Sequence, residues 1–108
     1  MSPQPLEIYS AQIAFNLCND RRPCIVLYPP SSESVFVALI SSQPALFDRQ
    51  YDFWIEPSHP DFFSTGLIKR SYVMGKHEYK INIAKLQKYY GRFEHVLAFE
   101  FKDWYGLQ

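Results

Sequence analysis

Apolar and polar positions follow short-period patterns in the first forty residues, which predicts β-strands. Glu7 to Phe15 alternates between the two kinds of residue, as expected for a strand buried mainly on the face that carries Tyr9. Cys24 to Tyr28 and Val35 to Ile40 are unbroken apolar runs rich in β-branched and aromatic residues, and each predicts a core strand. Pro29 to Ser34 has the composition of a loop, so the simplest geometry for the two core strands is a hairpin.

Shorter strands and longer loops are expected in the rest of the chain. Gln50 to Ile55, Leu67 to His77 and Tyr89 to Phe93 are rich in aromatic and aliphatic residues, and each predicts a strand. The polar segment Asn16 to Arg21 is expected to be a loop. Glu56 to Gly66, which contains two prolines, is expected to be a second and longer one.

Two helical elements are predicted towards the C-terminus. Asn82 to Lys88 is expected to form a short helical turn with its first residue as the cap. Further on, Leu97, Phe101 and Trp104 recur at helical spacing, which favours a C-terminal helix packed on the sheet. The alternation of Ala98 to Phe101 leaves a strand as the alternative.

The length of the chain, 108 residues, predicts one domain with a loose N-terminal arm over Met1 to Leu6. No apolar run is long enough to span a membrane, and no signal-peptide pattern is present, so we expect a cytoplasmic protein without membrane contacts. Cys18 and Cys24 could bridge across a hairpin, but a reducing compartment favours structural thiols.

Charge is balanced overall but unevenly distributed. Eleven basic residues offset eleven acidic ones, and this neutrality argues against a general nucleic-acid binder. From Phe62 to Phe93, seven basic residues accompany one acidic residue, a net charge of +6. From Glu33 to Asp61, one basic residue accompanies five acidic ones, a net charge of −4. The basic part is suited to following a phosphate backbone, although ordinary solvated lysines would give the same count.

Motifs for cofactor or metal chemistry are missing from the sequence. The four glycines form no phosphate-binding loop, and His59, His77 and His95 lack metal-ligand spacing. We therefore expect neither a cofactor nor a metal site.

A candidate anion site is predicted at one end of the hairpin. Arg22 enters the first core strand, and Ser41, Ser42 and Gln43 leave the second, so these side chains are expected at the same end of the strand pair. A guanidinium offers a planar fork of donors to phosphate or carboxylate, and a serine hydroxyl can donate to the same oxyanion. An Arg before Pro is also compatible with an ordinary exposed side chain.

The same residues carry a family resemblance. Arg22-Pro23 before an aliphatic strand, followed by a strand that ends in Ile40-Ser41-Ser42-Gln43, resembles the MazF/PemK (Kid) family of toxin endoribonucleases. The segment from Thr65 to Val73 is similar to that family's Gly-Leu-x-Lys-x-Ser-Val motif, and Ile81 to Phe93 continues the match. The resemblance implies a mostly β fold, a small SH3-like β-barrel of about six or seven strands with a C-terminal α-helix, as in the MazF/PemK and CcdB toxins.

The resemblance also implies a function and partners. It implies a metal-independent mRNA endoribonuclease that is the toxin of a type II toxin–antitoxin system and acts as a homodimer. Single-stranded RNA and a cognate antitoxin are the implied partners. The 2′-hydroxyl of the RNA would attack the adjacent phosphate and give 2′,3′-cyclic phosphate and 5′-hydroxyl ends.

Site residues follow from the matched positions. Arg22 and Ser41 correspond to the family's catalytic Arg and Thr or Ser, and Asp20, close to two arginines, is our hypothesis for the general base. For Phe62 and Phe63 the choice lies between stacking on unpaired bases and plugging the barrel end. The remaining expected RNA contacts are Arg21, Ser42, Gln43, Lys69 and Arg70.

Other functions remain open because the N-terminal region departs from the family pattern. The usual Gly-Asp before the first strand is missing, and the loop from Asn16 to Arg21 is short. A gyrase-targeting toxin of the same fold would not need Arg22 and Ser41. A catalytically inactive relative or an SH3-like binding module is also compatible with the sequence.

Overall fold

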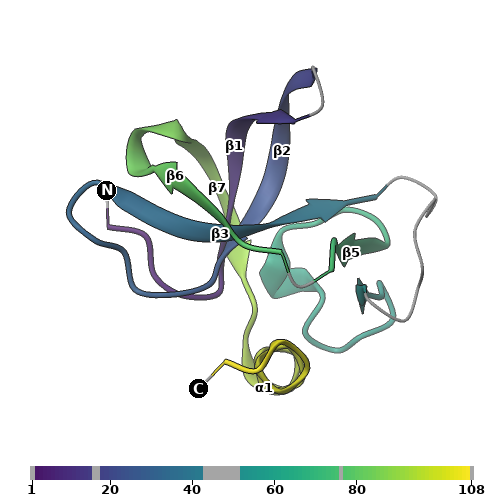
Figure 1. Cartoon of the computed structure of the whole chain (residues 1–108). Coiled ribbons are helices and arrows are strands. Elements are labelled where there is room, and N and C mark those ends of the chain that lie inside the picture. The colour runs from purple at the N-terminus through teal and green to yellow at the C-terminus, as the bar shows by residue number, and fades with distance from the viewer. Residues whose placement is uncertain (1, 16–17, 43–51, 76, 108) are drawn as a thin grey trace.

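The computed structural model describes residues 2–15, 18–42, 52–75 and 77–107, apart from the side chains of residues 13–15 and 18–21. This part of the chain forms an antiparallel sheet of seven strands and one C-terminal helix (Figure 1). The elements are β1 (Glu7–Phe15), β2 (Cys18–Val26), β3 (Ser34–Ser41), β4 (Phe53–Ile55), β5 (Ser71–Val73), β6 (Tyr79–Asn82), β7 (Leu86–Arg92) and α1 (His95–Tyr105), with the 3-10 helices η2 (Phe63–Thr65) and η3 (Ile83–Lys85).

The strands run in the order β4-β5-β3-β2-β1-β7, and β6 also pairs with β3. The predicted hairpin is confirmed, because β2 pairs antiparallel with β3 in a register that sets Cys24 against Leu39. On the other edge of β3, β5 pairs with its end and β6 with its beginning. In Figure 1, β3 consequently crosses the whole molecule and connects the two halves of the sheet.

The mostly β class with a C-terminal helix is confirmed, but the predicted barrel is not closed by strand pairing among the described residues. The loop that contains η2 lies against β7 instead. Ser64 Oγ donates a hydrogen bond to the Arg92 carbonyl at 2.9 Å. A Cβ atom at Gly66 or Gly91 would overlap the backbone across this contact. The η2 loop and β7 can therefore approach this closely only because both residues are glycine.

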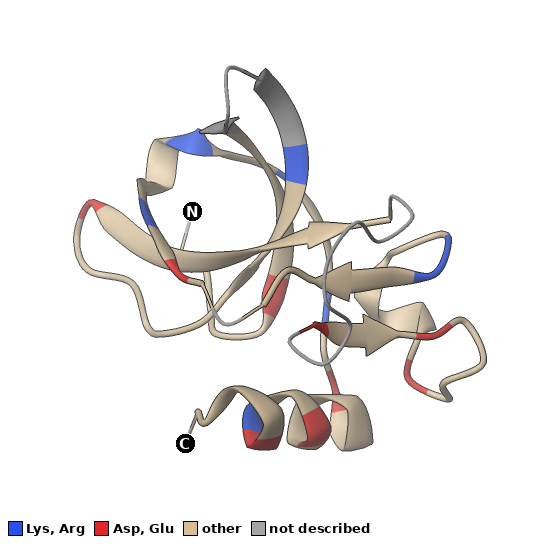
Figure 2. Cartoon of the chain, turned by 45° about the vertical axis from the view of Figure 1, so that its right-hand side comes forward, with Lys and Arg blue, Asp and Glu red and all other residues tan. Residues whose placement is uncertain are grey.

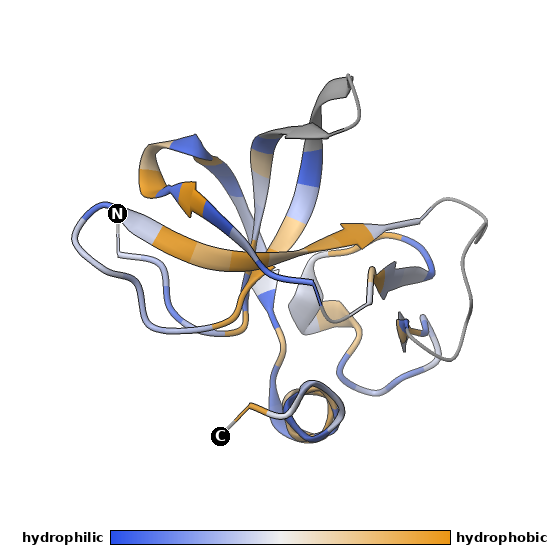
Figure 3. Cartoon of the chain, viewed as in Figure 1, coloured by the Kyte–Doolittle hydropathy of each residue, from blue (hydrophilic) through white to orange (hydrophobic). Residues whose placement is uncertain are grey.

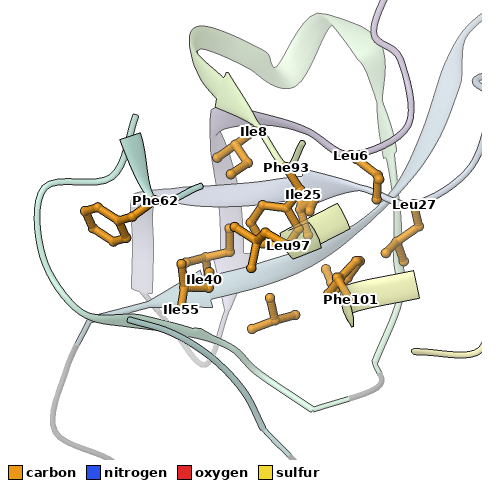
Figure 4. Close-up of a cluster of buried hydrophobic side chains, with 12 residues drawn as sticks. Leu6, Ile8, Ile25, Leu27, Ile40, Ile55, Phe62, Phe93, Leu97 and Phe101 are labelled. Carbon is orange, nitrogen blue, oxygen red and sulfur yellow. The ribbon is translucent and has the colours of Figure 1, made fainter. Parts of the chain in front are cut away.

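Two apolar clusters lie on the two faces of the sheet. Figure 4 shows the cluster between the sheet and α1, which is built around Ile8, Ile25, Ile40, Phe93 and Phe101. The other cluster contains the alternate residues of the same strands and is covered by η3 and β6. Because β3 is buried on both faces, its hydropathy is high along most of its length (Figure 3). This explains the unbroken apolar runs in the sequence.

The predicted C-terminal helix is confirmed, and the predicted turn is confirmed only as far as Lys85, because Leu86 begins β7. In α1, Leu97 and Phe101 are fully buried, and the Phe101 ring packs against Phe53, Phe93 and Trp104. The predicted turn forms η3, where the Asn82 side chain accepts a hydrogen bond from the backbone N–H of Ala84 at 2.8 Å. No helix in the described part of the chain is long and apolar enough to cross a membrane.

Three local predictions are corrected. The loop expected over Asn16 to Arg21 is a strand from Cys18 onward, since β2 continues to pair with β1 there, and residues 16 and 17 lie outside the described residues. β1 is buried on both faces, because α1 and the second cluster cover opposite sides of the sheet. Cys24 is a free, buried thiol on β2, and Cys18 lies on the same strand, so the two do not face each other across a hairpin.

Candidate functional site

A pocket of about 780 Å³ lies where β2 and β3 separate. Its walls come from four segments: β2, the end of β3, the segment that leads from η2 into β5, and β7. The lining residues with polar or charged side chains are Arg22, Ser41, Ser42, Lys69, Ser71, Lys88 and Tyr90.

The register of the hairpin explains why Arg22 and Ser41 share this pocket. Paired residues of β2 and β3 have numbers that add to 63, as in Cys24 with Leu39, and continuing this register sets Arg22 against Ser41. The pairing with β3 ends at Cys24, next to Pro23, which has no N–H group to donate to a ladder. Beyond this point no pair between β2 and β3 is formed among the described residues, although Ser41 still pairs with Tyr72 of β5 on the other edge of β3. The pocket lies at this opening between β2 and β3.

Arg22 is half-buried in the pocket wall, where its Nε atom is buried without a hydrogen-bond partner among the described residues. A buried donor of this kind is costly unless it is satisfied, and a guanidinium favours a bidentate oxyanion. Ser41 is 6% exposed, so its hydroxyl is held in a largely desolvated position. The two residues therefore provide an arginine donor fork and an alcohol on opposite strands of one pocket.

The opposite wall is the segment from Gly66 to Ser71. It is fixed from both ends by hydroxyl groups: Thr65 Oγ1 accepts from the Leu67 N–H at 3.1 Å, and Ser71 Oγ donates to the Lys69 carbonyl at 2.9 Å. Gly66 adopts a left-handed backbone conformation (φ 72°), which turns the chain into the pocket wall. Lys69 is exposed in this wall, and its predicted contact with RNA stays a prediction.

Sequence reasoning missed Lys88 and Tyr90, which line the pocket from β7. The sequence predicts Lys88 within the helical turn and the last strand from Tyr89 onward, whereas β7 begins at Leu86. Residues two apart in a strand share a face, so a predicted strand that began at Leu86 would have placed Lys88 and Tyr90 on the same face.

The other predicted site residues fall into two groups. Ser42 is exposed and lines the pocket. Asp20 and Arg21 lie on β2 opposite Ile13 and Gln12 of β1, but their side chains are outside the described residues, as is the whole of Gln43. The proposed roles of Asp20, Arg21 and Gln43 therefore stay predictions.

The two phenylalanines have opposite surroundings. Phe62 is buried in the core cluster under α1, so its predicted stacking on RNA bases is wrong, because its ring is already packed against other side chains. Phe63 is 91% exposed and remains accessible. Arg70 lies outside the pocket lining, where it forms an ion pair with Glu56 and packs over the Trp54 ring at 3.9 Å.

The pocket is basic, whereas another side of the molecule, at α1, carries more acidic residues (Figure 2). No described Asp or Glu lines the pocket, which contains Arg22, Lys69 and Lys88. In Figure 2, acidic residues are drawn on α1 and on the loop that follows β4, whereas basic residues predominate on the strands above. His59 belongs to the acidic side, where its Nε2 atom lies 2.7 Å from Glu100 Oε1. Within the described residues, no group of His, Cys, Asp and Glu could hold a metal ion.

Comparisons with known proteins identify the fold. No protein-family model and no curated protein sequence matches the chain. Among solved structures, the Mycobacterium tuberculosis toxin MazF-mt6 is similar with a TM-score of 0.63 and 20% identity, over 94% of this chain and 98% of that one. An endoribonuclease in complex with its cognate antitoxin, from a mycobacterial species, is similar with a TM-score of 0.69 and 11% identity, over 97% and 92%. The chain therefore has the fold of the MazF toxin structures, as its sequence motifs predict.

Proposed function

We propose that this protein is the toxin of a toxin–antitoxin pair and cleaves single-stranded RNA without a metal ion. The observation that carries the proposal is the shared pocket of Arg22 and Ser41. Two residues singled out from the sequence lie there on opposite strands, in a basic cavity without a described carboxylate. The fold likeness to a MazF toxin and to an antitoxin-bound endoribonuclease supports the same conclusion.

The chemistry needs little from the protein, because RNA carries its own nucleophile. The ribose 2′-oxygen forms a bond to phosphorus, the bond from phosphorus to the 5′-oxygen breaks, and the products are a 2′,3′-cyclic phosphate and a 5′-hydroxyl. A base takes the proton of the 2′-hydroxyl, and the leaving 5′-oxygen gains one. Negative charge accumulates on the phosphoryl oxygens, and fixed donors lower the barrier most when they point at that charge.

Each residue has a role that suits its chemistry. A guanidinium stays protonated at neutral pH, so Arg22 acts as a fixed bidentate donor to the phosphoryl oxygens rather than as a base. Ser41 donates from its hydroxyl to the same group or orients the ribose. Asp20 is the proposed base, and Asp20→Asn should then remove the acidic limb of the pH–rate profile. Ser42 and Lys69 hold the neighbouring phosphates.

The proposal includes a homodimer that binds RNA and the antitoxin at one groove. A gyrase-targeting toxin of the same fold is the second candidate, but it gives no reason for Arg22 and Ser41 to share a basic pocket.

Incubation of the purified protein with single-stranded RNA in EDTA tests the proposal. Arg22→Ala and Ser41→Ala should each lower the cleavage rate by about 10²–10³-fold, the usual effect of removing one donor to a developing oxyanion. Arg92→Ala is the matched control, since the Arg92 side chain is exposed and outside the pocket lining, and it should cleave at the wild-type rate.

Two results decide against the proposal. Intact RNA together with inhibited gyrase supports the second candidate. If a strand of the same sequence with 2′-deoxyribose throughout is cleaved as fast as the RNA, the nucleophile is not the 2′-hydroxyl.

A further inference from the structure

Strand β7 pairs irregularly with β1 where it passes the pocket. The register shifts twice, and at each shift β7 has one residue more than the facing part of β1. At the first shift Gln87 and Lys88 lie opposite the single residue Ser10, and at the second Tyr90 has no counterpart. The pairs that define the shifts are Ala11 with Leu86, Tyr9 with Tyr89, and Ile8 with Gly91. Such β-bulges redirect side chains and are frequent beside active sites.

A buried hydroxyl stabilises the first bulge. Ser10 Oγ accepts a hydrogen bond from the Lys88 backbone N–H at 3.0 Å, and Ser10 is 3% exposed. The serine side chain thus replaces the ladder partner that the bulge removes from the Lys88 amide. Because this bond uses only the backbone of Lys88, the position of the residue is fixed while its side chain is available to the pocket.

Both bulged residues, Lys88 and Tyr90, line the pocket of Arg22 and Ser41. Lys88 Nζ lies 5.7 Å from the centre of the Tyr90 ring, within the range of a cation–π interaction. No described carboxylate is within ion-pair distance of Lys88. The ammonium group is therefore beside an aromatic face, without a neutralising partner among the described residues, in a pocket that already contains an arginine.

We infer that Lys88 is a further catalytic residue, which contacts the scissile phosphate together with Arg22, and that Tyr90 is the positioning residue that holds its ammonium group. This inference rests on the proposed function. The phosphorane carries more negative charge than the ground-state phosphodiester, so a second cation stabilises the transition state more than the bound substrate. Lys88 transfers no proton in this role, and the bonds made and broken are those given above. Lys69 is a weaker candidate because it lies on a loop segment rather than on a strand.

Single-turnover cleavage of labelled single-stranded RNA of mixed sequence, in EDTA and at saturating protein, tests the role of Lys88. Lys88→Met removes the charge and keeps an unbranched side chain, and it should slow cleavage by about 10²-fold, whereas Lys88→Arg should recover at least a tenth of the wild-type rate. Lys80→Met is the matched control, because Lys80 is an exposed strand lysine that does not line the pocket, and it should cleave normally.

Binding to the DNA version of the same strand, which cannot react, separates affinity from rate. In Lys88→Met its affinity should fall by less than tenfold, and the slope of log K against log salt should become shallower by about 0.7, the value for one lost contact to a single strand. Tyr90→Leu should slow cleavage several-fold and Tyr90→Phe, which keeps the ring, should not. In the Lys88→Met background, Tyr90→Leu should have no further effect.

The outcomes distinguish the inference from the proposed function. If Arg22→Ala is inactive while Lys88→Met cleaves at the wild-type rate, the inference is wrong and the proposed function stands. If Lys88→Met and Lys80→Met lose the same factor in cleavage rate and change the salt slope equally, Lys88 acts only through nonspecific electrostatic attraction of RNA. That result also overturns the inference. If the wild-type protein leaves RNA intact, the proposed function fails and the inference fails with it. Circular dichroism and a thermal melt check that each variant is folded.

Discussion

Replacement of Gly91 by Ala tests whether the contact between β7 and the η2 loop holds the pocket together. An added Cβ would lie 2.7 Å from the Thr65 carbonyl carbon and 2.9 Å from the Thr65 oxygen, and closer still to the Ser64 oxygen. Carbon atoms in contact prefer about 3.5–4.0 Å, so the loop backbone must retreat by roughly 1 Å. These neighbours are backbone atoms, which cannot turn aside as a flexible side chain can.

The displacement should affect both stability and the pocket. Overpacking typically costs about 1–3 kcal/mol, and with backbone neighbours we expect about 2 kcal/mol. For a domain of this size that corresponds to a Tm lowered by about 8–16 °C. The hydrogen bond from Ser64 to the Arg92 carbonyl should weaken, and the pocket wall from Gly66 to Ser71 should move away from Arg22. RNA cleavage, measured well below the Tm, should therefore fall by at least tenfold.

Gly106→Ala is the matched control for this experiment. Gly106 has a left-handed backbone (φ 93°), but nothing lies within 4 Å of an added Cβ, and the residue is outside the pocket lining. Its replacement should cost about 1 kcal/mol through backbone strain and leave cleavage unchanged. If Gly91→Ala melts at the wild-type temperature and cleaves normally, the loop does not depend on this contact, and our account of how the pocket is built is refuted.

Two further predictions concern the core. Phe101→Ala should lower the free energy of unfolding by about 3–5 kcal/mol in urea titrations, because the fully buried Phe101 ring joins α1 to the sheet. Phe99 lies on the exposed side of α1, so Phe99→Ala should change the free energy of unfolding by no more than about 0.5 kcal/mol. An equal effect of the two would contradict the assigned face of α1. Burial raises the pKa of the Cys24 thiol to about 12. Burial is also the largest cause that raises the pKa values of Tyr9 and Tyr105 to about 12. Above about pH 9 the unfolded chain loses protons that the folded chain keeps, so stability should fall as pH rises towards 12, and native Cys24 should resist alkylation at pH 8 until urea unfolds the chain. Stability that is constant from pH 8 to 11, or rapid alkylation of native Cys24, would contradict this.

Much of the candidate site follows from the order of residues along one hairpin. Arg22 and Ser41 are expected at the same end of two strands because a short loop between apolar runs fixes an antiparallel pair. The pairing observed as far as Cys24 with Leu39 leads directly to these two residues. The opening between them has a local signal too, since Pro23 cannot donate to a ladder. Asp20 and Gln43 belong to the same prediction, but the structure describes neither side chain.

The errors arose where packing, rather than periodicity, decides. Asn16 to Arg21 is polar enough to predict a loop, yet pairing with β1 extends β2 back to Cys18. Adjacent phenylalanines in a loop look equivalent in the sequence, but only Phe62 turns into the core under α1, while Phe63 is left outside. Which of two neighbours is buried depends on the surface that the loop meets.

The sequence alone determined the core strands and their hairpin and favoured the C-terminal helix, because spacing along a chain reports directly which faces are apolar. The tertiary structure alone decided that the segment from Gly66 to Ser71 would close the pocket and that Lys88 would enter it from β7. These placements depend on close backbone approaches at Gly66 and Gly91 and on two shifts in strand register. Such contacts join segments far apart in the chain, and they arise from the fit of one backbone against another, which leaves no periodic pattern in the sequence.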